Sequence, residues 1–322
     1  LNFERNDFEN DLIYCDKDSY DFLNYSHVKE NDVLMNKIAN PGSVYLMPKV
    51  EYRATCGMNL FLLRFKNINQ KYMYYVMKLN EDYIKSQTHG TTTKTITKDE
   101  VRNLEFTIND DLTYQERIVS LLDTIENQIY RNNDMVHKLQ VLALRAFDYY
   151  STLDRESNSV ILKDIIVERD KSKIQVNDVQ ESSGNFPFFT SGETILYTDK
   201  QLTNGFNIYL STGGNAKVQS YYGEAAYSTD TWCITAKDNL QFYLYGYLKH
   251  IEAQMDKLYF HGTGLKHLQK PIFLKSKIYI PKCTSLEKYN KIVAQFYRQI
   301  SEIQKVNFRL QALKSKLLPL LI

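Results

Sequence analysis

Two long stretches of the chain have apolar residues spaced as on one face of an α-helix. Residues 115–153 contain no glycine or proline, and their apolar positions recur in steps of three and four. A long core helix within one domain explains this stretch alone as well as a coiled coil does. The stripe consists of Ile118, Leu122, Ile125, Ile129, Val136, Leu139, Ala143 and Ala146, with the polar Asn132 in the same seam.

The end of the chain repeats the pattern and favours the coiled coil. Residues 287–318 again lack glycine and proline, and we expect Pro319 to end the helix. Aligning Leu122 with Phe296 brings the two stripes into register over four heptads, and Gln299 is the polar position of the second stripe. Each helix then buries the apolar face of the other, and the polar seam residues help to fix orientation and register. The second stripe consists of Tyr289, Ile292, Phe296, Ile303, Val306, Leu310, Leu313 and Leu317.

Shorter segments upstream of the two helices also recur at a similar distance. The stretch 88–91 returns at 260–263, with a His-Gly-Thr sequence in both copies. A repeat of this length indicates duplication of a whole domain and not a solenoid unit. The second copy has an additional opening at residues 160–174, so we expect the first domain to lack its first elements. Three further segments correspond, namely 33–35 with 208–210, 42–44 with 216–218, and 104–108 with 275–280.

Both copies have the alternating and helical patterns of a mixed domain. We expect helices at residues 70–84 and 241–255, and a short helix or strand at the opening of the second copy. The expected strands are residues 32–35, 44–47, 58–65 and 104–108 in the first copy and 186–190, 207–211, 216–221, 231–236 and 277–280 in the second. The fold class is therefore α+β, with two domains in a pseudo-two-fold repeat separated by two long antiparallel coiled-coil helices. The predicted segments are residues 1–112 and 154–283 for the domains, and 113–153 and 284–322 for the helices.

Composition places the chain among soluble globular proteins. Its 322 residues are 43% hydrophobic and 24% charged, which is enough for two domains with their own cores. No apolar run approaches the length of a membrane span, so we expect no membrane association. The isolated cysteines Cys15, Cys56, Cys233 and Cys283 favour a reducing cytoplasm over a disulfide framework or a metal site.

The charge distribution is more informative than the net charge of +2. Residues 257–282 contain six lysines and no acidic residue, and residues 85–98 of the first copy also lack acids. Such runs are more often solvated faces than binding sites. Their recurrence at the same place in both copies favours a surface that faces phosphates.

No constellation predicts an active site. Residues 212–217 resemble a phosphate loop, but Val218 follows the lysine where that motif has serine or threonine, so a glycine turn is the better interpretation. Hydrolase, dinucleotide-binding and zincin motifs are absent. His261 and His267 have no neighbouring ligand residues for a metal. The stretch 40–43 only begins like the motif that methylates exocyclic amines.

The arrangement resembles the specificity subunit of a type I restriction–modification enzyme. In that family a variable α/β domain followed by a long helix occurs twice. Two features depart from the family pattern: the second helix lacks the Glu-Gln pair, and the proline-rich lead is reduced to Ile280-Pro281. The resemblance is carried by the opening Ile161-Leu162-Lys163-Asp164-Ile165, the loops Gly90-Thr91 and Gly262-Thr263, and the helix start Tyr114-Gln115-Glu116-Arg117-Ile118.

This resemblance implies a DNA-reading subunit without catalysis of its own. Each target recognition domain would read one half of a bipartite, asymmetric site in double-stranded DNA, and the helix pair would set the number of unread bases. Two methylation subunits would bind S-adenosylmethionine and methylate adenine. Motor-nuclease subunits would use ATP and Mg²⁺ for cleavage, so no cofactor is expected in this chain.

Base readers are expected among polar residues of the loops, because base edges specify sequence whereas phosphate contacts only position the protein. Two other functions remain open, a coiled-coil scaffold or adaptor that binds proteins, and an enzyme such as a methyltransferase. The candidate DNA contacts are Asn36, Lys37, Asn40, Ser43, Thr91, Thr92 and Lys94 in the first copy, and Thr212, Asn215, Lys217, Gln219, Thr263 and Lys266 in the second.

Overall fold

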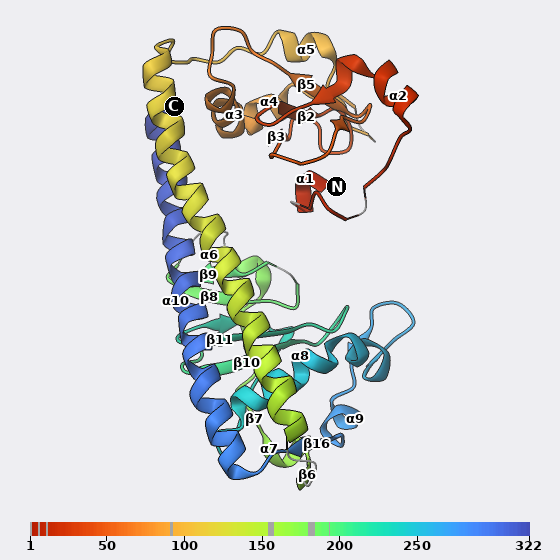
Figure 1. Ribbon diagram of the computed structural model, residues 1–322, viewed down its shortest axis with the longest axis vertical. Coiled ribbons are helices and arrows are strands. Elements are labelled where there is room, and N and C mark those ends of the chain that lie inside the picture. Colours follow the sequence, from red (N-terminus) through yellow and green to blue (C-terminus); the bar gives the residue numbers. More distant parts are fainter. Residues whose placement is uncertain are drawn as a thin grey trace. The chain divides into compact units, whose positions relative to one another are not determined.

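The chain forms two compact units, one of which combines both ends of the sequence, whereas the other is a continuous stretch (Figure 1). Unit 1 comprises Leu1–Gln128 and Gln311–Ile322, and unit 2 comprises Ile129–Leu310. The computed structural model describes residues 2–5, 7–10, 12–90, 93–153, 158–179, 184–192 and 194–322.

Two long helices contribute to both units, as the apolar periodicity predicts. They are α6 (Leu112–Leu153) and α10 (Cys283–Leu321). The expectation that Pro319 ends the second helix is wrong, because α10 continues through it to Leu321. A proline so close to the end removes few helical hydrogen bonds. The last turn is also held in place, since the Tyr114 hydroxyl donates to the Leu321 carbonyl at 2.9 Å.

Unit 1 has a three-stranded antiparallel sheet in the order β3-β2-β5, and α3 packs on β2 and β3. The strand expected at residues 104–108 is not formed. Its counterpart in unit 2, β16, pairs with β6, whereas no described strand pairs with residues 104–108. The three other strands expected in this copy are confirmed, whereas the single helix expected at residues 70–84 is divided at Asn80 into α3 and α4. The elements are α1 (Asn2–Arg5), α2 (Lys17–Phe22), β1 (His27–Val28), β2 (Val33–Asn36), β3 (Val44–Leu46), β4 (Ala54–Thr55), β5 (Leu60–Leu63), α3 (Gln70–Leu79), α4 (Glu81–Ser86) and α5 (Lys98–Arg102).

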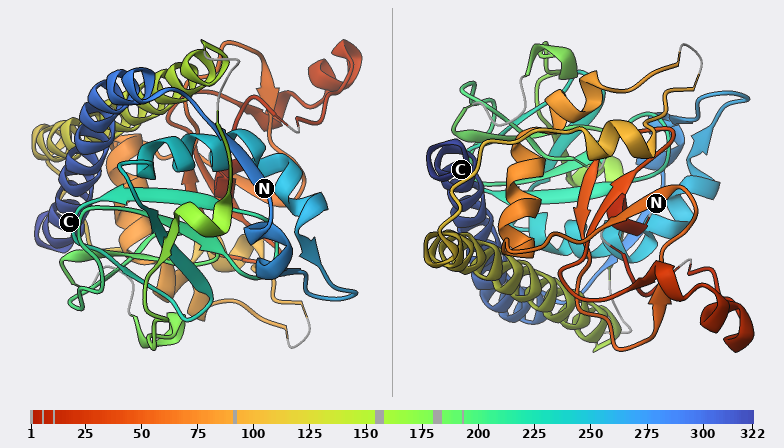
Figure 2. Two further views of the ribbon diagram at one scale, coloured as in Figure 1. Left: turned by 90° about the horizontal axis from the view of Figure 1, so that it is seen from below. Right: turned by 90° about the horizontal axis from the view of Figure 1, so that it is seen from above.

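Unit 2 has a four-stranded antiparallel sheet in the order β11-β10-β13-β7, and α8 packs across it (Figure 2). A second sheet, β12-β8-β9, contains the parallel pair β8 and β12. The strands and the helix expected here are confirmed. The elements are β6 (Asn158–Ile161), α7 (Leu162–Ile165), β7 (Ile166–Glu168), β8 (Phe186–Phe189), β9 (Leu196–Thr198), β10 (Phe206–Ser211), β11 (Val218–Tyr222), β12 (Ala226–Tyr227), β13 (Thr231–Ala236), α8 (Gln241–Leu258), β14 (Phe260–His261), β15 (His267–Leu268), α9 (Lys270–Leu274) and β16 (Lys277–Ile280).

An equivalent hydrogen bond between a helix and the sheet occurs in each unit and confirms the duplication. In unit 1 the backbone N–H of Val44, the first residue of β3, donates to Glu81 Oε1 at 2.9 Å. In unit 2 the N–H of Val218, the first residue of β11, donates to Glu252 Oε1 at 2.8 Å. A lysine three residues earlier pairs with each glutamate. Each unit therefore uses an equivalent glutamate, Glu81 or Glu252, to fix the start of its outer strand. Both units have the same mixed α/β architecture.

Inside each unit α6 and α10 run antiparallel. In unit 1, Lys314 pairs with Glu126, and Tyr114 bonds to Leu321. In unit 2, Asn132 Nδ2 donates to Asn307 Oδ1 at 2.6 Å. The residue numbers thus rise along α6 as they fall along α10. Asn307 Nδ2 also donates to Asn133 Oδ1 at 2.8 Å, so an amide cluster interrupts the apolar seam.

The seam of α10 follows the predicted stripe at Tyr289, which is buried, but departs from it further along the helix. Ile292, Val306 and Leu313 are 40%, 43% and 45% exposed, and Gln299 is also exposed. The apolar side chains of α10 occupy adjacent helical positions, so the sequence contains two overlapping stripes. The packing of unit 2 selects the second. Its buried members are Val293, Tyr297, Ile300 and Asn307, which have the same mutual spacing as Ile118, Leu122, Ile125 and Asn132 of α6.

Asn307→Ala is expected to lower the free energy of unfolding by about 1–3 kcal/mol, because Asn132 and Asn133 each lose a hydrogen bond to its amide group. Gln299→Ala, on the exposed face of the same helix, is the matched control and should stay within about 0.5 kcal/mol of the parent. Urea unfolding followed by far-UV circular dichroism measures both. Equal losses for the two variants would contradict a structural role for the amide cluster.

Candidate nucleic-acid interface

The recurrent Gly-Thr segments begin the same hairpin in both units. In unit 1 the backbones of His89 and Thr95 exchange hydrogen bonds of 2.9 and 2.8 Å. In unit 2, β14 pairs with β15 at the equivalent place. Gly90 and Gly262 have φ angles of 110° and 155°, and an added Cβ would lie 2.4 and 2.5 Å from a backbone oxygen across the turn. Only glycine fits there, which gives the repeated glycine a structural cause.

Equivalent backbone bonds join each hairpin to the residue that follows a central strand. Ile96 N–H donates to the Lys37 carbonyl at 3.1 Å, and Leu268 N–H donates to the Thr212 carbonyl at 3.0 Å. The N–H groups of Lys37 and Thr212 donate in turn to the carbonyls of Asn59 and Asp230, at 2.9 and 3.2 Å. Three loops therefore converge in each unit. We call this surface the loop end, formed by residues 36–43, 57–59, 89–90 and 93–95 in unit 1 and residues 211–217, 228–230 and 261–267 in unit 2.

The structure places most predicted readers of unit 1 at its loop end. Asn36 is half-buried and donates to the Tyr45 hydroxyl at 3.2 Å. Lys37 Nζ donates to the Met58 carbonyl at 2.7 Å and lies 4.7 Å from the centre of the Phe61 ring. The side chains of Asn40 and Lys94 are exposed, whereas Thr91 and Thr92 lie outside the described residues.

Ser43 is a correction to the predicted readers. It is only 4% exposed, and its Oγ is buried. Its position beside the start of β3 turns the side chain into the unit, so the hydroxyl does not reach a base edge. We omit it from the proposed contacts.

The loop end of unit 2 carries a different set of side chains. Asn215 and Thr263 are exposed. The Thr212 hydroxyl donates to the Asp230 carbonyl at 2.7 Å, and Lys217 Nζ donates to the Gly192 carbonyl at 2.9 Å. Lys266 forms an ion pair of 2.7 Å with Asp256. The candidate lysines of unit 2 thus already have partners within the unit.

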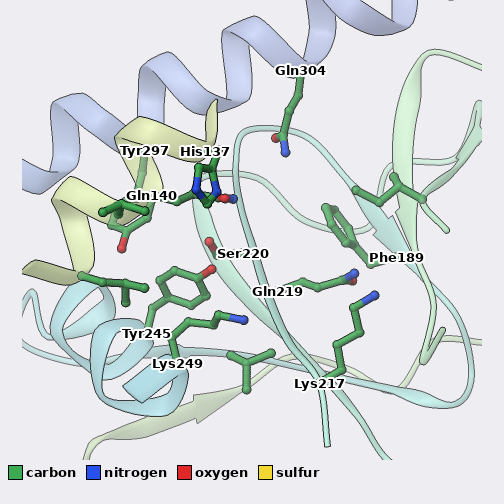
Figure 3. Close-up of a pocket in the computed structure, with 14 residues that line it drawn as sticks. His137, Gln140, Phe189, Lys217, Gln219, Ser220, Tyr245, Lys249, Tyr297 and Gln304 are labelled. Carbon is green, nitrogen blue, oxygen red and sulfur yellow. The ribbon is translucent and has the colours of Figure 1, made fainter. Parts of the chain in front are cut away.

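Gln219 lies on β11, outside the loop end of unit 2. Together with Lys217 it faces a cavity of about 350 Å³ between β11 and the long helices within unit 2 (Figure 3). His137 and Gln140 of α6, Lys249 of α8 and Gln304 of α10 also line it, and none of its lining residues is acidic. Gln219 therefore faces this cavity, and Lys217 of the loop end lines it as well.

Two of the six lysines in residues 257–282 lie beside acidic side chains, which offset part of the positive charge of this run. Lys266 pairs with Asp256, and its hydrogen bond holds the pKa of that carboxyl below the usual value. Lys270 lies 3.7 Å from Glu168 and 4.3 Å from the centre of the Trp232 ring, and burial lowers its pKa. The remaining lysines of the run, Lys257, Lys275, Lys277 and Lys282, are exposed.

Sequence reasoning missed the third loop of each loop end. Residues 57–59 and 228–230 precede β5 and β13, and each accepts a backbone bond from the residue after the central strand. Met58 in this loop is 86% exposed. The two loops occupy equivalent places in the repeat, which was the available signal.

The described residues offer no alternative site for metal chemistry. Within them, no group of three or more His, Cys, Asp or Glu side chains is placed to hold a metal ion.

In the same part of the chain, none of the helices has the length and apolarity needed to cross a membrane.

Comparison with known proteins assigns the family. The profile of the type I restriction modification DNA specificity domain matches residues 4–138 and again residues 155–312. The chain therefore belongs to the family of type I restriction–modification specificity subunits. No curated protein sequence matches it significantly.

Several solved structures are similar to this chain. The S subunit of a type I restriction–modification system from M. genitalium is 18% identical, with a TM-score of 0.58 over 92% of this chain and 83% of that one. The HsdS subunit from Thermoanaerobacter tengcongensis is 14% identical, with a TM-score of 0.35 over 91% and 80%. A chain from a study of complex assembly and conformational transition of the type I R-M system is 12% identical, with a TM-score of 0.38 over 91% and 82%. The first of these shows that the fold is shared.

Proposed function

We propose that this chain is the sequence-reading subunit of a type I restriction–modification complex and recognises a bipartite, asymmetric site in double-stranded DNA. The observation that carries the proposal is the loop end, which occurs in both units on the same backbone framework with different side chains. Unit 1 presents Asn40, Met58 and Lys94, whereas unit 2 presents Asn215 and Thr263. Because base edges are distinguished by such side chains, different loop ends read different half-sites.

The chemistry belongs to the partner subunits in this proposal. Methylation subunits bring S-adenosylmethionine and modify adenine, and motor-nuclease subunits use ATP and Mg²⁺ to cleave DNA. The specificity chain contributes recognition alone. Its loop ends contain amide, hydroxyl and ammonium groups, which suit hydrogen bonding to bases and phosphates.

Exchange of one domain tests whether the two loop ends read independently. Residues 158–282 are replaced by the corresponding domain of a family member with another specificity, and the methylated bases of cells expressing the complex are sequenced. We expect one half of the methylated motif to change and the other half to remain, because each loop end lies within one unit. A change in both halves would contradict independent reading, and loss of all methylation with intact assembly would favour an adaptor function.

Exposed apolar residues on the long helices support a second part of the proposal, that two methylation subunits bind this chain. Leu121, Met135, Leu142 and Tyr149 lie at heptad positions of one face of α6 and are 43%, 49%, 47% and 61% exposed. Ile292, Val306, Leu313 and Leu320 recur in the same way along α10, at 40%, 43%, 45% and 79%. Gln128 and Gln299 occupy the remaining heptad position of each stripe.

Exposed apolar stripes of this kind suit the apolar face of a partner helix. The two stripes have matching sequences, Leu-Gln-Met-Leu-Tyr and Ile-Gln-Val-Leu-Leu at successive heptad positions. One stripe on each helix therefore accommodates two copies of the same partner, as the proposed pair of methylation subunits requires.

Leu142→Glu is expected to remove one methylation subunit from the complex, and Leu142→Glu combined with Leu313→Glu to remove both. A buried charge without a partner opposes docking of an apolar helix face. Asn127→Glu, exposed on α6 outside the stripe, is the control and should assemble normally. Co-purification followed by native mass spectrometry counts the bound subunits. Full assembly of the double variant would exclude the stripes as the docking surface.

A further inference from the structure

Lys94 and Lys266 occupy the same position of the duplicated hairpin but have different surroundings. Each lies four residues after the glycine that the turn requires, Gly90 in unit 1 and Gly262 in unit 2. Lys266 Nζ lies 2.7 Å from Asp256 Oδ2, and its side chain is 44% exposed. Lys94 is exposed, and among the residues that the structure describes its ammonium group has no polar partner.

The carboxylate of unit 2 has no counterpart in unit 1. Glu81 and Glu252, the glutamates that fix the outer strands, are equivalent in the repeat, and counting onward from each aligns Asp256 with Lys85. Lys85 pairs with Glu81 at 3.1 Å. Glu100, which follows the hairpin of unit 1 in the sequence, contacts the hairpin at His89. Its Oε1 lies 2.6 Å from His89 Nε2. Unit 1 thus has a lysine, Lys85, at the position where unit 2 has Asp256, the partner of its hairpin lysine.

Asp256 also fixes backbone in unit 2, which gives its pairing with Lys266 a structural purpose. Its Oδ1 accepts the N–H of Ala216 at 3.1 Å, just before β11. Asp256 therefore ties the hairpin to the turn that precedes β11. To contact a DNA phosphate, Lys266 would have to give up this ion pair, whereas Lys94 gives up only water.

We infer that the two hairpins have different roles, with Lys94 a phosphate contact of unit 1 and Lys266 an internal support of the loop end of unit 2. This inference rests on the DNA binding proposed above. It makes the two units electrostatically unequal: the hairpin of unit 1 binds the backbone of any duplex, and the hairpin of unit 2 adds no comparable charge.

Salt dependence separates the two roles, because each phosphate neutralised by a protein cation adds about 0.9 to the slope of log affinity against log salt concentration. The complex with its methylation subunits is titrated with a duplex carrying its methylation site and with an unrelated duplex. Lys94→Ala should reduce the slope by about 0.9 on both duplexes. Over a fourfold rise in salt concentration, the affinity of this variant should therefore fall by a factor about 3.5 times smaller than the affinity of the parent. Lys266→Ala should leave the slope unchanged.

Asp256→Asn provides the reverse test. The amide oxygen still accepts from Ala216, but the charge that holds Lys266 is removed. This variant should raise the slope by up to about 0.9. Equal reductions for Lys94→Ala and Lys266→Ala, or no reduction for Lys94→Ala in a complex that binds DNA with salt dependence, would overturn the inference while leaving the proposed function intact. Absence of DNA binding by the parent complex would overturn both.

Discussion

The antiparallel pairing of α6 with α10 is the constraint on which the two units depend. Each unit takes one segment from each of the two helices. In unit 2, Leu139 and Ala143 of α6 and Val293 and Tyr297 of α10 belong to the same core as the central sheet. The helix segments and the sheet of unit 2 therefore share one hydrophobic core.

Duplication has preserved backbone interactions and allowed the loop side chains to differ. The hairpin bonds to Lys37 and Thr212 and the carboxylate contacts of Glu81 and Glu252 recur in both units. These bonds involve main-chain groups, so they tolerate changes in the exposed side chains. A scaffold of this kind separates the stability of a loop end from its specificity, which is the property that a family of DNA readers requires.

The elements predicted best from the sequence were those set by long periodic patterns and by the repeat itself. The two helices, the central strands and the position of the two Gly-Thr loops follow from such signals, whereas the hairpin pairing of those loops was not predicted. The failures arise where tertiary contacts decide between local alternatives. Two stripes overlap on α10, so packing excluded Gln299 and selected Asn307; contacts with Tyr114 hold the helix beyond Pro319; and residues 104–108 lack a partner strand. The ion pair of Lys266 was equally hidden, because Asp256 lies on a preceding helix.

In the proposed function the paired helices form one frame that carries two DNA-reading loop ends. Insertion of one heptad after Asn133 and one after Lys305 preserves the seam and lengthens both helices by about 10 Å. Sequencing of methylated bases in cells that carry this variant gives the recognised motif directly. B-DNA advances about 3.4 Å per base pair, so 10 Å corresponds to about three base pairs. We therefore expect unchanged half-sites separated by about three additional unread base pairs. The parental spacing, retained in an active complex, would contradict it.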